Sequence, residues 1–366
     1  MERLLVTCGG TGGHFYPGLS VARTFQQSGK EVLIILSGVN SVAQAEIAGS
    51  FGIKAVALPQ MPSPRHAPLK FLRGYFSGIK AAKRIIKDFA PQALLGMGSF
   101  AMLPVAKAAK ACKVPLFLHD GNAFVGKANR YFSRNAVAMG VGFPAVNGKK
   151  CRCPVFDVGM PVRPELLQFA AMSKAEAIAG LNKLFDLQLD PAVPTLLITG
   201  GSQGAAIFNE TLPAALKNVS GKIQVLHLAG KGKMADTAAR YRGMDIPLLL
   251  LEKHESMQLF MAAADLVISR SGGSTVAELA LFGKAAVLVP YPYAANDHQR
   301  FNAAYLTESG AGVLVNNADF SVEKAASLLQ DFLDQPEKWR KFSENAAKKA
   351  HPEAAQAMLD LIAERI

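Results

Sequence analysis

A glycine-rich turn followed by a histidine lies near the start of the chain, in VTCGGTGGHFYPG at residues 6–18. A glycine turn between a strand and a helix points backbone N–H groups and the positive end of the helix dipole at a ligand, which suits a phosphate group. His14 would stand on the first turn of that helix, where an imidazole can transfer a proton or bind a substrate hydroxyl. The alternative is that the glycines only let the backbone turn tightly.

The spacing of these glycines argues against two common nucleotide-binding motifs. Neither GGTGGH nor GKGK at 230–233 matches G-x-x-x-x-G-K-[ST], so a nucleoside triphosphatase is not expected. The turn also departs from G-x-G-x-x-G, and the second apolar run ends in LIILSG without the acidic residue that would bind a dinucleotide ribose. A dehydrogenase is therefore not expected either.

A second glycine turn, RSGGST at 270–275, follows the apolar run DLVIS and carries three hydroxyl groups. Glu278 follows Thr275 by three residues, which is the spacing of a helix capping box. The alternative is that Glu278 accepts hydrogen bonds from the two hydroxyls of a ribose. Both interpretations of Glu278 stay open at this point.

A third polar cluster, Asp297, His298 and Gln299, follows the apolar run AAVLVP and the segment YPYAAN. Ligands bind at the carboxyl ends of the strands in open α/β sheets, so these side chains are candidate ligand contacts. The alternative is that Asp297 caps a helix whose first turn is solvated.

These residues need strands and helices to hold them, and the chain alternates short apolar runs with helix-length segments. Twelve apolar runs are typical of strands, six before residue 142 and six after residue 193. Such runs predict βαβ units around buried parallel sheets, and twelve strands are too many for one small sheet. We therefore expect an α/β fold with two doubly wound domains and a boundary near residue 160. The helical segment from PEKWRKF at 336–342 onward could return to the first domain.

Composition indicates a globular protein of a reducing compartment. Half of the 366 residues are hydrophobic, no run of about 18 apolar residues occurs, and glycines follow the first strand before a signal peptide could form. We expect the chain to stay in the cytosol. The cysteines, including the CRC stretch at 151–153, lack a second pair at metal-ligand spacing and fit ordinary thiols.

The charge balance favours polyanionic partners, because 40 Lys and Arg against 28 Asp and Glu give a net charge of +12. The excess is concentrated at 64–91, where apolar residues also recur at helical spacing, a pattern usually found in a core. The alternative is that this segment docks on an anionic membrane. We call the candidate residues the basic–aromatic surface: Phe71, Leu72, Arg73, Tyr75, Phe76, Ile79, Lys80, Lys83, Arg84 and Lys87. No DNA- or RNA-binding motif is visible, so nucleic acid is not an expected partner.

Several stretches together resemble the MurG family of bacterial glycosyltransferases, in the family's order and nearly end to end. They are GGTGGHFYPGLSVA, LGMGSFAMLPVAKAAK, HDGNAFVGKANR, GMPVR, TGGSQGAAIFNE, and RSGGSTVAELALFGKAAVLVPYP with DHQRFNA. The resemblance implies a GT-B architecture, two Rossmann-like doubly wound domains facing across a cleft. It implies an acceptor- and membrane-facing domain at 1–160, completed by a C-terminal helix at about 340–366, and a UDP-sugar-binding domain at 161–339.

The resemblance also implies a reaction. N-acetylglucosamine would pass from UDP-N-acetylglucosamine to the 4-hydroxyl of lipid-linked N-acetylmuramyl-pentapeptide, with inversion to a β-1,4 bond. His14 is the expected general base, with Asp120 behind it. Arg163 and helix N-termini can stabilise the leaving diphosphate, and the sequence has no Asp-x-Asp, so neither a metal nor another cofactor is expected. By resemblance, the donor-binding residues are Thr11, Gly12, Gly13, Asn122, Arg163, Ser202, His254, Gly273, Ser274, Thr275, Val276, Ala277, Glu278, His298 and Gln299.

The chain departs from the family pattern at three places. HDGN at 119–122 replaces the usual His-Glu-Gln-Asn, Ser99 and Phe100 stand where the family usually has Gly and Tyr, and KHES at 253–256 lies near the expected uracil pocket. These differences leave open a transferase of the same fold that acts on another lipid, such as diacylglycerol. A UDP-sugar 2-epimerase is a further alternative, although it has no need of a basic–aromatic surface. We expect a peripheral protein on the cytoplasmic face of the plasma membrane, with other cell-wall enzymes as possible partners.

Overall fold

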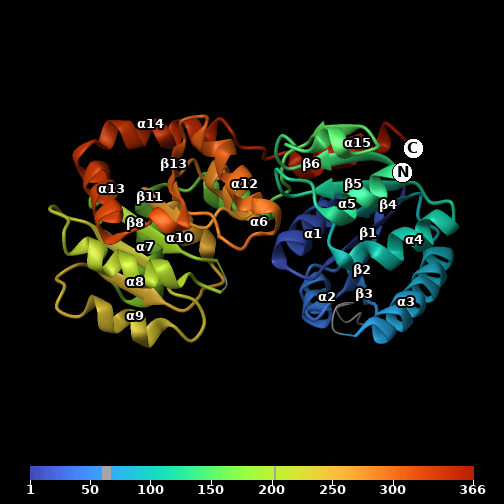
Figure 1. Cartoon of the computed structure of the whole chain (residues 1–366), viewed down its shortest axis with the longest axis horizontal. Helices are drawn as coiled ribbons and strands as arrows, with labels where there is room; N and C mark the ends of the chain where they lie inside the picture. The colour runs from blue at the N-terminus through green and yellow to red at the C-terminus, as the bar shows by residue number, and fades with distance from the viewer. Residues whose placement is uncertain (60–66, 202) are drawn as a thin grey trace. The chain divides into compact units, whose positions relative to one another are not determined.

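The computed structural model describes residues 1–59, 67–201 and 203–366 and divides into two compact units (Figure 1). Unit 1 comprises Met1–Arg163 and His351–Ile366, and unit 2 comprises Pro164–Ala350. The sequence placed the return to the first domain at about residue 340. In the structure α14 (Pro336–Ala347) still packs on strands of unit 2, so the return begins only at His351.

Unit 1 contains a seven-stranded sheet, within the described residues, in the order β3-β2-β1-β4-β5-β6-β7, and all its recorded neighbours pair in parallel. The sequence runs predicted six of these strands and missed β7, which has only three residues. The strands are β1 (Arg3–Gly9), β2 (Glu31–Ser37), β3 (Lys54–Ala57), β4 (Ala93–Gly96), β5 (Leu116–Asp120), β6 (Ala136–Val141) and β7 (Val155–Asp157).

Helices cover both faces of this sheet, because successive strand residues point to opposite sides. Leu4 and Val6 of β1 pack in a core with α1 and α15, whereas Leu5 packs in a second core with α3 and α4. The C-terminal helix α15 contacts α1. The helices of unit 1 are α1 (Gly12–Gln27), α2 (Ser41–Ser50), α3 (Pro68–Phe89), α4 (Leu103–Ala111), α5 (Lys127–Phe132) and α15 (Ala354–Ala363).

Unit 2 contains a six-stranded parallel sheet, again among the described residues, in the order β10-β9-β8-β11-β12-β13. All six were predicted as strands. They are β8 (Thr195–Thr199), β9 (Gln224–Leu228), β10 (Leu248–Leu251), β11 (Leu266–Ser269), β12 (Ala285–Leu288) and β13 (Gly312–Leu314).

The helices of unit 2 also lie on both faces of their sheet. Helix α8 packs with α13 around Phe208 and Phe332, while α7 packs with α10. The helices are α6 (Pro164–Ala170), α7 (Lys174–Phe185), α8 (Ala206–Leu216), α9 (Met234–Tyr241), α10 (Met257–Ala263), α11 (Gly273–Leu281), α12 (His298–Thr307), α13 (Val322–Asp334) and α14.

Each sheet has one point at which the strand order reverses, between β1 and β4 in unit 1 and between β8 and β11 in unit 2. Connections leave such a point toward opposite faces, so the loops at the carboxyl ends of the two strands diverge and leave a crevice for a ligand. The two glycine turns that the sequence singled out follow β1 and β11, and the glycines of the TGGSQG stretch follow β8. They therefore lie at these two reversal points.

Candidate active site

The turn after β1 exposes the start of α1. Gly9 and Gly10 have φ of 128° and 83°, which favour glycine, and α1 begins at Gly12. Thr11 is the N-cap, but its side chain makes no capping hydrogen bond. Thr11, Gly12 and Gly13 are all exposed, so the first N–H groups of α1 can bind an anionic or polar ligand.

His14 links the two strands at the reversal point of unit 1. Its Nδ1 lies 2.9 Å from the carbonyl oxygen of Met97, the residue that follows β4. A carbonyl only accepts hydrogen bonds, so Nδ1 carries the proton and Nε2 of the neutral ring remains an acceptor. His14 is half-buried, and this arrangement fixes the tautomer that a general base requires.

Asp120, at the end of β5, binds the loop that follows it. Its Oδ1 accepts the N–H of Asn122 at 3.2 Å. Its Oδ2 accepts the N–H of Gly126 at 2.8 Å and Nδ2 of Asn129 at 2.9 Å. The carboxylate is therefore occupied by its own loop and by α5, while Nδ1 of His14 is bound to a backbone carbonyl. This geometry makes Asp120 a positioning residue for Asn122.

Two asparagines that sequence reasoning missed complete this loop. Asn147 accepts the N–H of Val125 at 2.8 Å and donates to its carbonyl at 3.1 Å, a closed pair of hydrogen bonds. Asn129 also donates to the carbonyl of His119 at 2.9 Å. Both asparagines are buried. Asn129 lies with its partners in the HDGNAFVGKANR stretch, whereas Asn147 lies outside it, so that stretch could not have revealed Asn147.

The departure at Gly121 has a packing explanation. A Cβ at this position would lie 2.8 Å from Cε of Met160. Met160 thus occupies the space that a side chain at 121 would need, so the glycine and the methionine fit each other. At the other departure, Ser99 has φ of 63° next to Gly98 with φ of 85°, while the Phe100 side chain is exposed.

Arg163 is the last residue of the first segment of unit 1. Its guanidinium carbon lies 5.3 Å from the ring centroid of Tyr16 on α1, two residues beyond His14. The preceding carbonyl, of Val162, accepts the hydroxyl of Ser20 at 2.6 Å. The structure thus holds Arg163 on α1, beside the first glycine turn, whereas the resemblance assigns it to the donor side.

The turn after β8 is crowded. A Cβ on Gly204 would lie 2.0 Å from the carbonyl oxygen of Ala229, and one on Gly200 would lie 2.2 Å from the backbone nitrogen of Ala205. These glycines allow the turn to pack against the end of β9. Ser202, an expected donor contact in this turn, lies outside the described residues.

The turn after β11 corrects the capping interpretation of Glu278. Helix α11 begins at Gly273, its N-cap is Gly272, and no side chain caps it. Thr275 and Glu278 are both inside the helix, so they cannot form a capping box, which requires the first of the pair at the N-cap. Gly273 and Val276 are buried, while Ser274, Thr275, Ala277 and Glu278 are half-buried. The N–H groups at the start of α11 are therefore not capped by its own side chains.

The turn after β12 is tied to the turn after β11. Ser271 donates its hydroxyl to the carbonyl of Gln299 at 2.7 Å, and Oε1 of Gln299 accepts the N–H of Tyr291 at 2.9 Å. Asp297 stands at the N-cap of α12 with φ of 53° and makes no side-chain cap, which argues against its capping role. Nδ1 of His298 binds the carbonyl of Ala295 at 2.9 Å. The Gln299 side chain thus has a structural bond, and His298 keeps Nε2 for a ligand.

Arg270 and His254 complete the polar residues of this edge. Nη1 of Arg270 lies 3.0 Å from the carbonyl oxygens of Val289 and Pro290, and this cation was not singled out by the sequence. Its half-burial lowers its pKa, yet the guanidinium remains charged. The His254 ring lies 5.2 Å from that of Phe185 and accepts the N–H of Ser256, so this side chain belongs to an aromatic cluster.

Helix α3 carries the basic–aromatic surface, and its apolar stripe is divided. Ile79 and Ile86 pack toward the core with α4, as the core interpretation predicted. Leu72 and Phe76 are 47% and 65% exposed. Phe71 stacks on Tyr75 at 6.1 Å between ring centroids, and both are half-buried.

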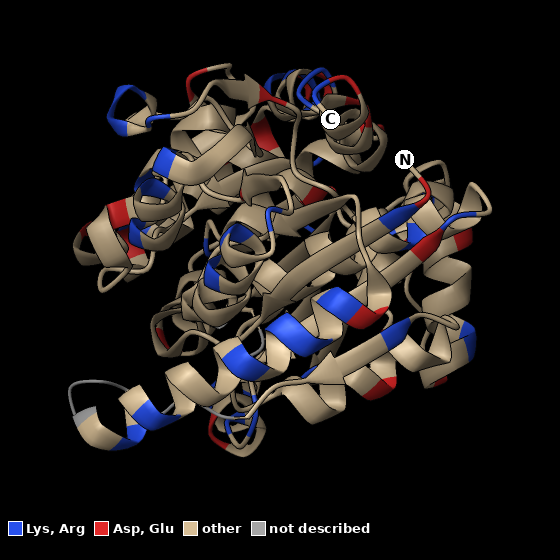
Figure 2. Cartoon of the chain, turned by 90° about the vertical axis from the view of Figure 1, so that its right-hand side faces the viewer, with Lys and Arg blue, Asp and Glu red and all other residues tan. Residues whose placement is uncertain are grey.

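The basic residues of α3 are all exposed. Figure 2 shows Lys and Arg following one another along this helix. Arg84 makes an exposed ion pair with Asp88 at 3.8 Å, which contributes little to stability. Tyr131, which sequence reasoning missed, is 52% exposed and lies under the guanidinium of Arg134. Burial raises the pKa of Tyr75, and the nearby Tyr131 phenol raises it further. The surface therefore extends from α3 to α5.

The described residues include neither a metal-binding cluster nor a membrane-spanning helix. In the parts of the chain that the structure describes, no cluster of three or more His, Cys, Asp or Glu side chains is arranged to hold a metal ion. No helix there is both long and apolar enough to cross a membrane.

Two Rossmann-like units with glycine turns at their strand-reversal points define the class of GT-B glycosyltransferases, and comparison with known proteins supports this class. Models of the glycosyltransferase family 28 N-terminal and C-terminal domains match residues 4–141 and 195–358. The crystal structure of MurG from Acinetobacter baumannii is similar over 100% of both chains, with a TM-score of 0.78 and 28% identity. The expected α/β fold is confirmed.

Curated relatives identify the family. The UDP-N-acetylglucosamine--N-acetylmuramyl-(pentapeptide) pyrophosphoryl-undecaprenol N-acetylglucosamine transferase of Haemophilus ducreyi is 34% identical over 99% of both chains. The protein of the same name from Desulfitobacterium hafniense strain Y51 is 32% identical over 98% of both. The chain therefore belongs to glycosyltransferase family 28, in the MurG group of these relatives. A Neisseria meningitidis UDP-GlcNAc 2-epimerase, 13% identical with a TM-score of 0.72 over 99% of this chain and 100% of its own, shares the fold alone.

Proposed function

We propose that the protein transfers N-acetylglucosamine from UDP-N-acetylglucosamine to the 4-hydroxyl of lipid-linked N-acetylmuramyl-pentapeptide. The names of its full-length relatives support both substrates. The observation that carries the chemistry is the hydrogen bond from Nδ1 of His14 to Met97, which leaves Nε2 able to accept a proton. This reaction belongs to cell-wall peptidoglycan synthesis.

In the proposed mechanism, Nε2 of His14 removes the proton of the attacking hydroxyl as the oxygen bonds to C1 of the sugar. The bond from C1 to the diphosphate breaks from the opposite side, which inverts the anomeric centre and releases UDP. A positioned base contributes about 10²–10⁴-fold to such a step. Asp120 supports it indirectly by holding the loop that carries Asn122.

Unit 2 supplies the proposed nucleotide contacts. The start of α11, which no side chain caps, would offer N–H groups and the positive helix end to the diphosphate, and Glu278, inside the same helix, would accept the ribose hydroxyls. His298 and Gln299 would contact the sugar, and Arg163 would contact the diphosphate. Because the N-terminus of α11 and the guanidinium of Arg163 supply positive charge to the diphosphate, we propose that turnover needs no metal ion.

The first experiment is transfer of labelled N-acetylglucosamine to a lipid-linked muramyl-pentapeptide analogue in detergent, with chelator present. We expect a β-1,4-linked product and release of UDP. Failure of transfer despite tight binding of UDP-N-acetylglucosamine would refute the acceptor assignment and favour another lipid such as diacylglycerol. A strict Mg²⁺ requirement would refute the metal-free mechanism.

We also propose that the basic–aromatic surface holds the protein peripherally on the cytoplasmic face of the plasma membrane, where a lipid-linked acceptor lies. Exposed Leu72 and Phe76 can enter the headgroup region, and the basic residues of α3 can attract anionic lipids. A membrane surface would also bring other cell-wall enzymes within reach as partners.

The membrane proposal is tested by flotation with vesicles that contain or lack phosphatidylglycerol. Binding should require the anionic lipid and weaken as salt rises. Reversal of Lys80, Lys83, Arg84 and Lys87 to Glu should abolish it. The matched control reverses four exposed lysines of unit 2, Lys183, Lys217, Lys222 and Lys324, for the same change in net charge. Equal binding by both variants would show that only total charge matters.

A further inference from the structure

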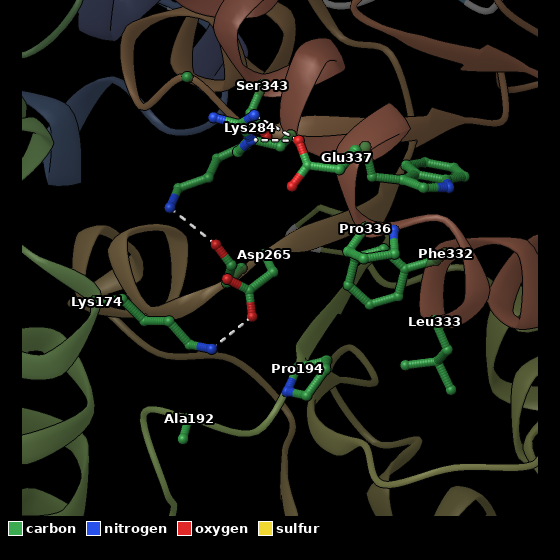
Figure 3. A pocket seen from close by; sticks show the side chains of 14 residues that line it. Lys174, Ala192, Pro194, Asp265, Lys284, Phe332, Leu333, Pro336, Glu337 and Ser343 are labelled. Carbon is green, nitrogen blue, oxygen red and sulfur yellow. Dashed lines mark hydrogen bonds and ion pairs between the residues drawn. The ribbon is translucent and has the colours of Figure 1, made fainter.

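A cavity of about 490 Å³ opens in unit 2 at the amino ends of its strands, the edge opposite the proposed nucleotide contacts (Figure 3). Pro194, Asp265 and Lys284 each stand one residue before β8, β11 and β12 respectively. The end of α13 and the first turns of α14 form the other wall. This volume lies within the range of small-molecule sites, which is about 300–1,000 Å³.

Two of the three cations that line the cavity have carboxylate partners. Lys174 binds Asp265 at 2.6 Å, and the same carboxylate oxygen accepts the N–H of Thr195 at 2.8 Å. Arg340 is paired with Glu337 and also with Glu344, the latter at 3.5 Å. These charges are therefore balanced within the protein.

Lys284 is the exception. Its Nζ donates to the carbonyl oxygens of Ala262 at 3.0 Å and Ala264 at 2.8 Å. Among the described residues no carboxylate lies within ion-pair distance of Lys284. The charge of Asp265 acts on the pKa of Lys284, but this carboxylate is already bound to Lys174. Burial lowers the pKa of Lys284 to about 8, so the ammonium form still predominates at neutral pH. An ammonium has three N–H donors, and one of these is left over.

The opposite wall of the cavity carries an apolar patch beside the Glu337–Arg340 ion pair. In Figure 3, Lys174, Asp265 and Lys284 lie on one side, and Phe332, Leu333 and Pro336 lie on the other. Trp339, the only tryptophan of the chain, also lines this side and is held by a hydrogen bond from its indole nitrogen to Asp331 at 2.9 Å. A ligand that fills the cavity would therefore meet a cation at one end and hydrocarbon at the other.

We propose that this cavity binds a small organic anion, with its carboxylate or phosphate group at Lys284 and its apolar part against Phe332, Leu333 and Pro336. The anion compensates the half-buried Lys284 ammonium, which has no carboxylate partner among the described residues, and this removes an electrostatic cost. Binding also removes the apolar part of the ligand from water and places it against Phe332, Leu333 and Pro336, which is favourable. This site is separate from the transfer reaction and does not depend on it.

The test measures Trp339 emission while the full-length protein is titrated with phenyl phosphate, benzoate or inorganic phosphate. Excess UDP is present throughout, so that a nucleotide site elsewhere in unit 2 is occupied. We expect a saturable change with at least one aromatic anion, and binding of inorganic phosphate about tenfold weaker because it lacks an apolar part. No saturable change with either aromatic anion would overturn the proposal, and equal affinity for inorganic phosphate would overturn its apolar half.

Two variants locate the site. Lys284→Met should weaken binding about tenfold or more. Because Lys284 also holds two carbonyls and its loss could disturb folding, Ala192→Glu provides a second variant: this exposed position lines the cavity, and a carboxylate there should repel the anion. Ala192→Gln and Lys217→Met, the latter at an exposed lysine outside the cavity lining, are the matched controls and should bind normally. Unchanged binding by Ala192→Glu would place the ligand elsewhere and refute the site.

Discussion

The glycine turns after β1 and after β8 look alike in sequence but need their glycines for different reasons. In the turn after β8, a Cβ on Gly204 would lie 2.0 Å from a backbone oxygen. In the turn after β1, a Cβ on Gly12 would first meet the Tyr16 ring at 3.4 Å, and one on Gly13 would first meet Thr11 Oγ1 at 3.9 Å. Internal packing thus requires glycine at 200 and 204 in unit 2, whereas Gly12 and Gly13 keep an exposed surface clear for a ligand.

Two histidines show the same contrast. His14 uses one ring nitrogen to bind a backbone carbonyl and keeps the other for chemistry. His227 is fully buried in unit 2, and its two nitrogens bind Asn209 at 3.0 Å and Tyr241 at 2.8 Å. A side chain whose polar atoms are all satisfied supports the fold, and one with an accessible free acceptor can act on a substrate.

The largest expected effect is that of His14→Ala. Removal of the proposed base should lower kcat by about 10²–10⁴-fold. The free energy of unfolding should change little, because His14 is half-buried and makes one side-chain hydrogen bond. Steady-state transfer assays and thermal unfolding measure the two quantities. Near-normal turnover would remove His14 from the role of base.

The next effect is on folding. Gly204→Ala should destabilise unit 2 by about 3 kcal/mol or more, because the methyl group would overlap the carbonyl of Ala229 and the backbone has φ of 63°. Gly201→Ala is the control, since its φ is 77° but nothing lies within 4 Å, and the left-handed conformation alone costs about 1–2 kcal/mol. Equal denaturation midpoints would contradict the packing explanation.

The sequence predicted the strands well because buried parallel strands are continuous apolar runs, a local signal. The one strand that it missed, β7, has three residues, and its burial depends on pairing with β6. Glycine turns were also visible locally. Which glycines are exposed and which are crowded could not be predicted, because the crowding depends on the folded path of the turn and on distant atoms such as the carbonyl of Ala229, which follows β9.

The sequence predicted which residues form the candidate site, but it did not predict the hydrogen bonds that hold them. The bond from His14 to Met97 spans 83 residues, and the loop after β5 is closed by Asn147. Spacing left open a capping box at Thr275 and Glu278, but the preceding glycines begin the helix three residues earlier. The hydrogen-bond partners of the site residues and the start of α11 therefore depend on the folded structure, and local motifs could not predict them.

A smaller effect on activity distinguishes the exposed glycines of the turn after β1 from the crowded glycines of the turn after β8. Gly13→Ala should lower kcat/KM about tenfold by obstructing the exposed turn, a loss of about 1.4 kcal/mol. Stability should be unchanged or slightly higher, because alanine favours the helix that begins there. Gly49→Ala, on α2 with nothing within 4 Å, should give the same stabilisation with normal activity. Normal activity of Gly13→Ala would make the first turn as structural as the second.

The smallest effect concerns pH. Burial lowers the pKa of His227 to about 3, whereas the unfolded chain titrates near its usual value of 6.5. Between these values the unfolded state binds more protons, so stability is lost as pH falls. The loss is about 1 kcal/mol between pH 7 and 5.5. Denaturation followed by Trp339 emission reports on unit 2, which contains the only tryptophan. His227→Gln can keep both hydrogen bonds but cannot titrate, so its stability should depend less on pH by that amount. An identical pH dependence in the two proteins would mean that His227 is not held neutral, and the contrast with His14 would fail.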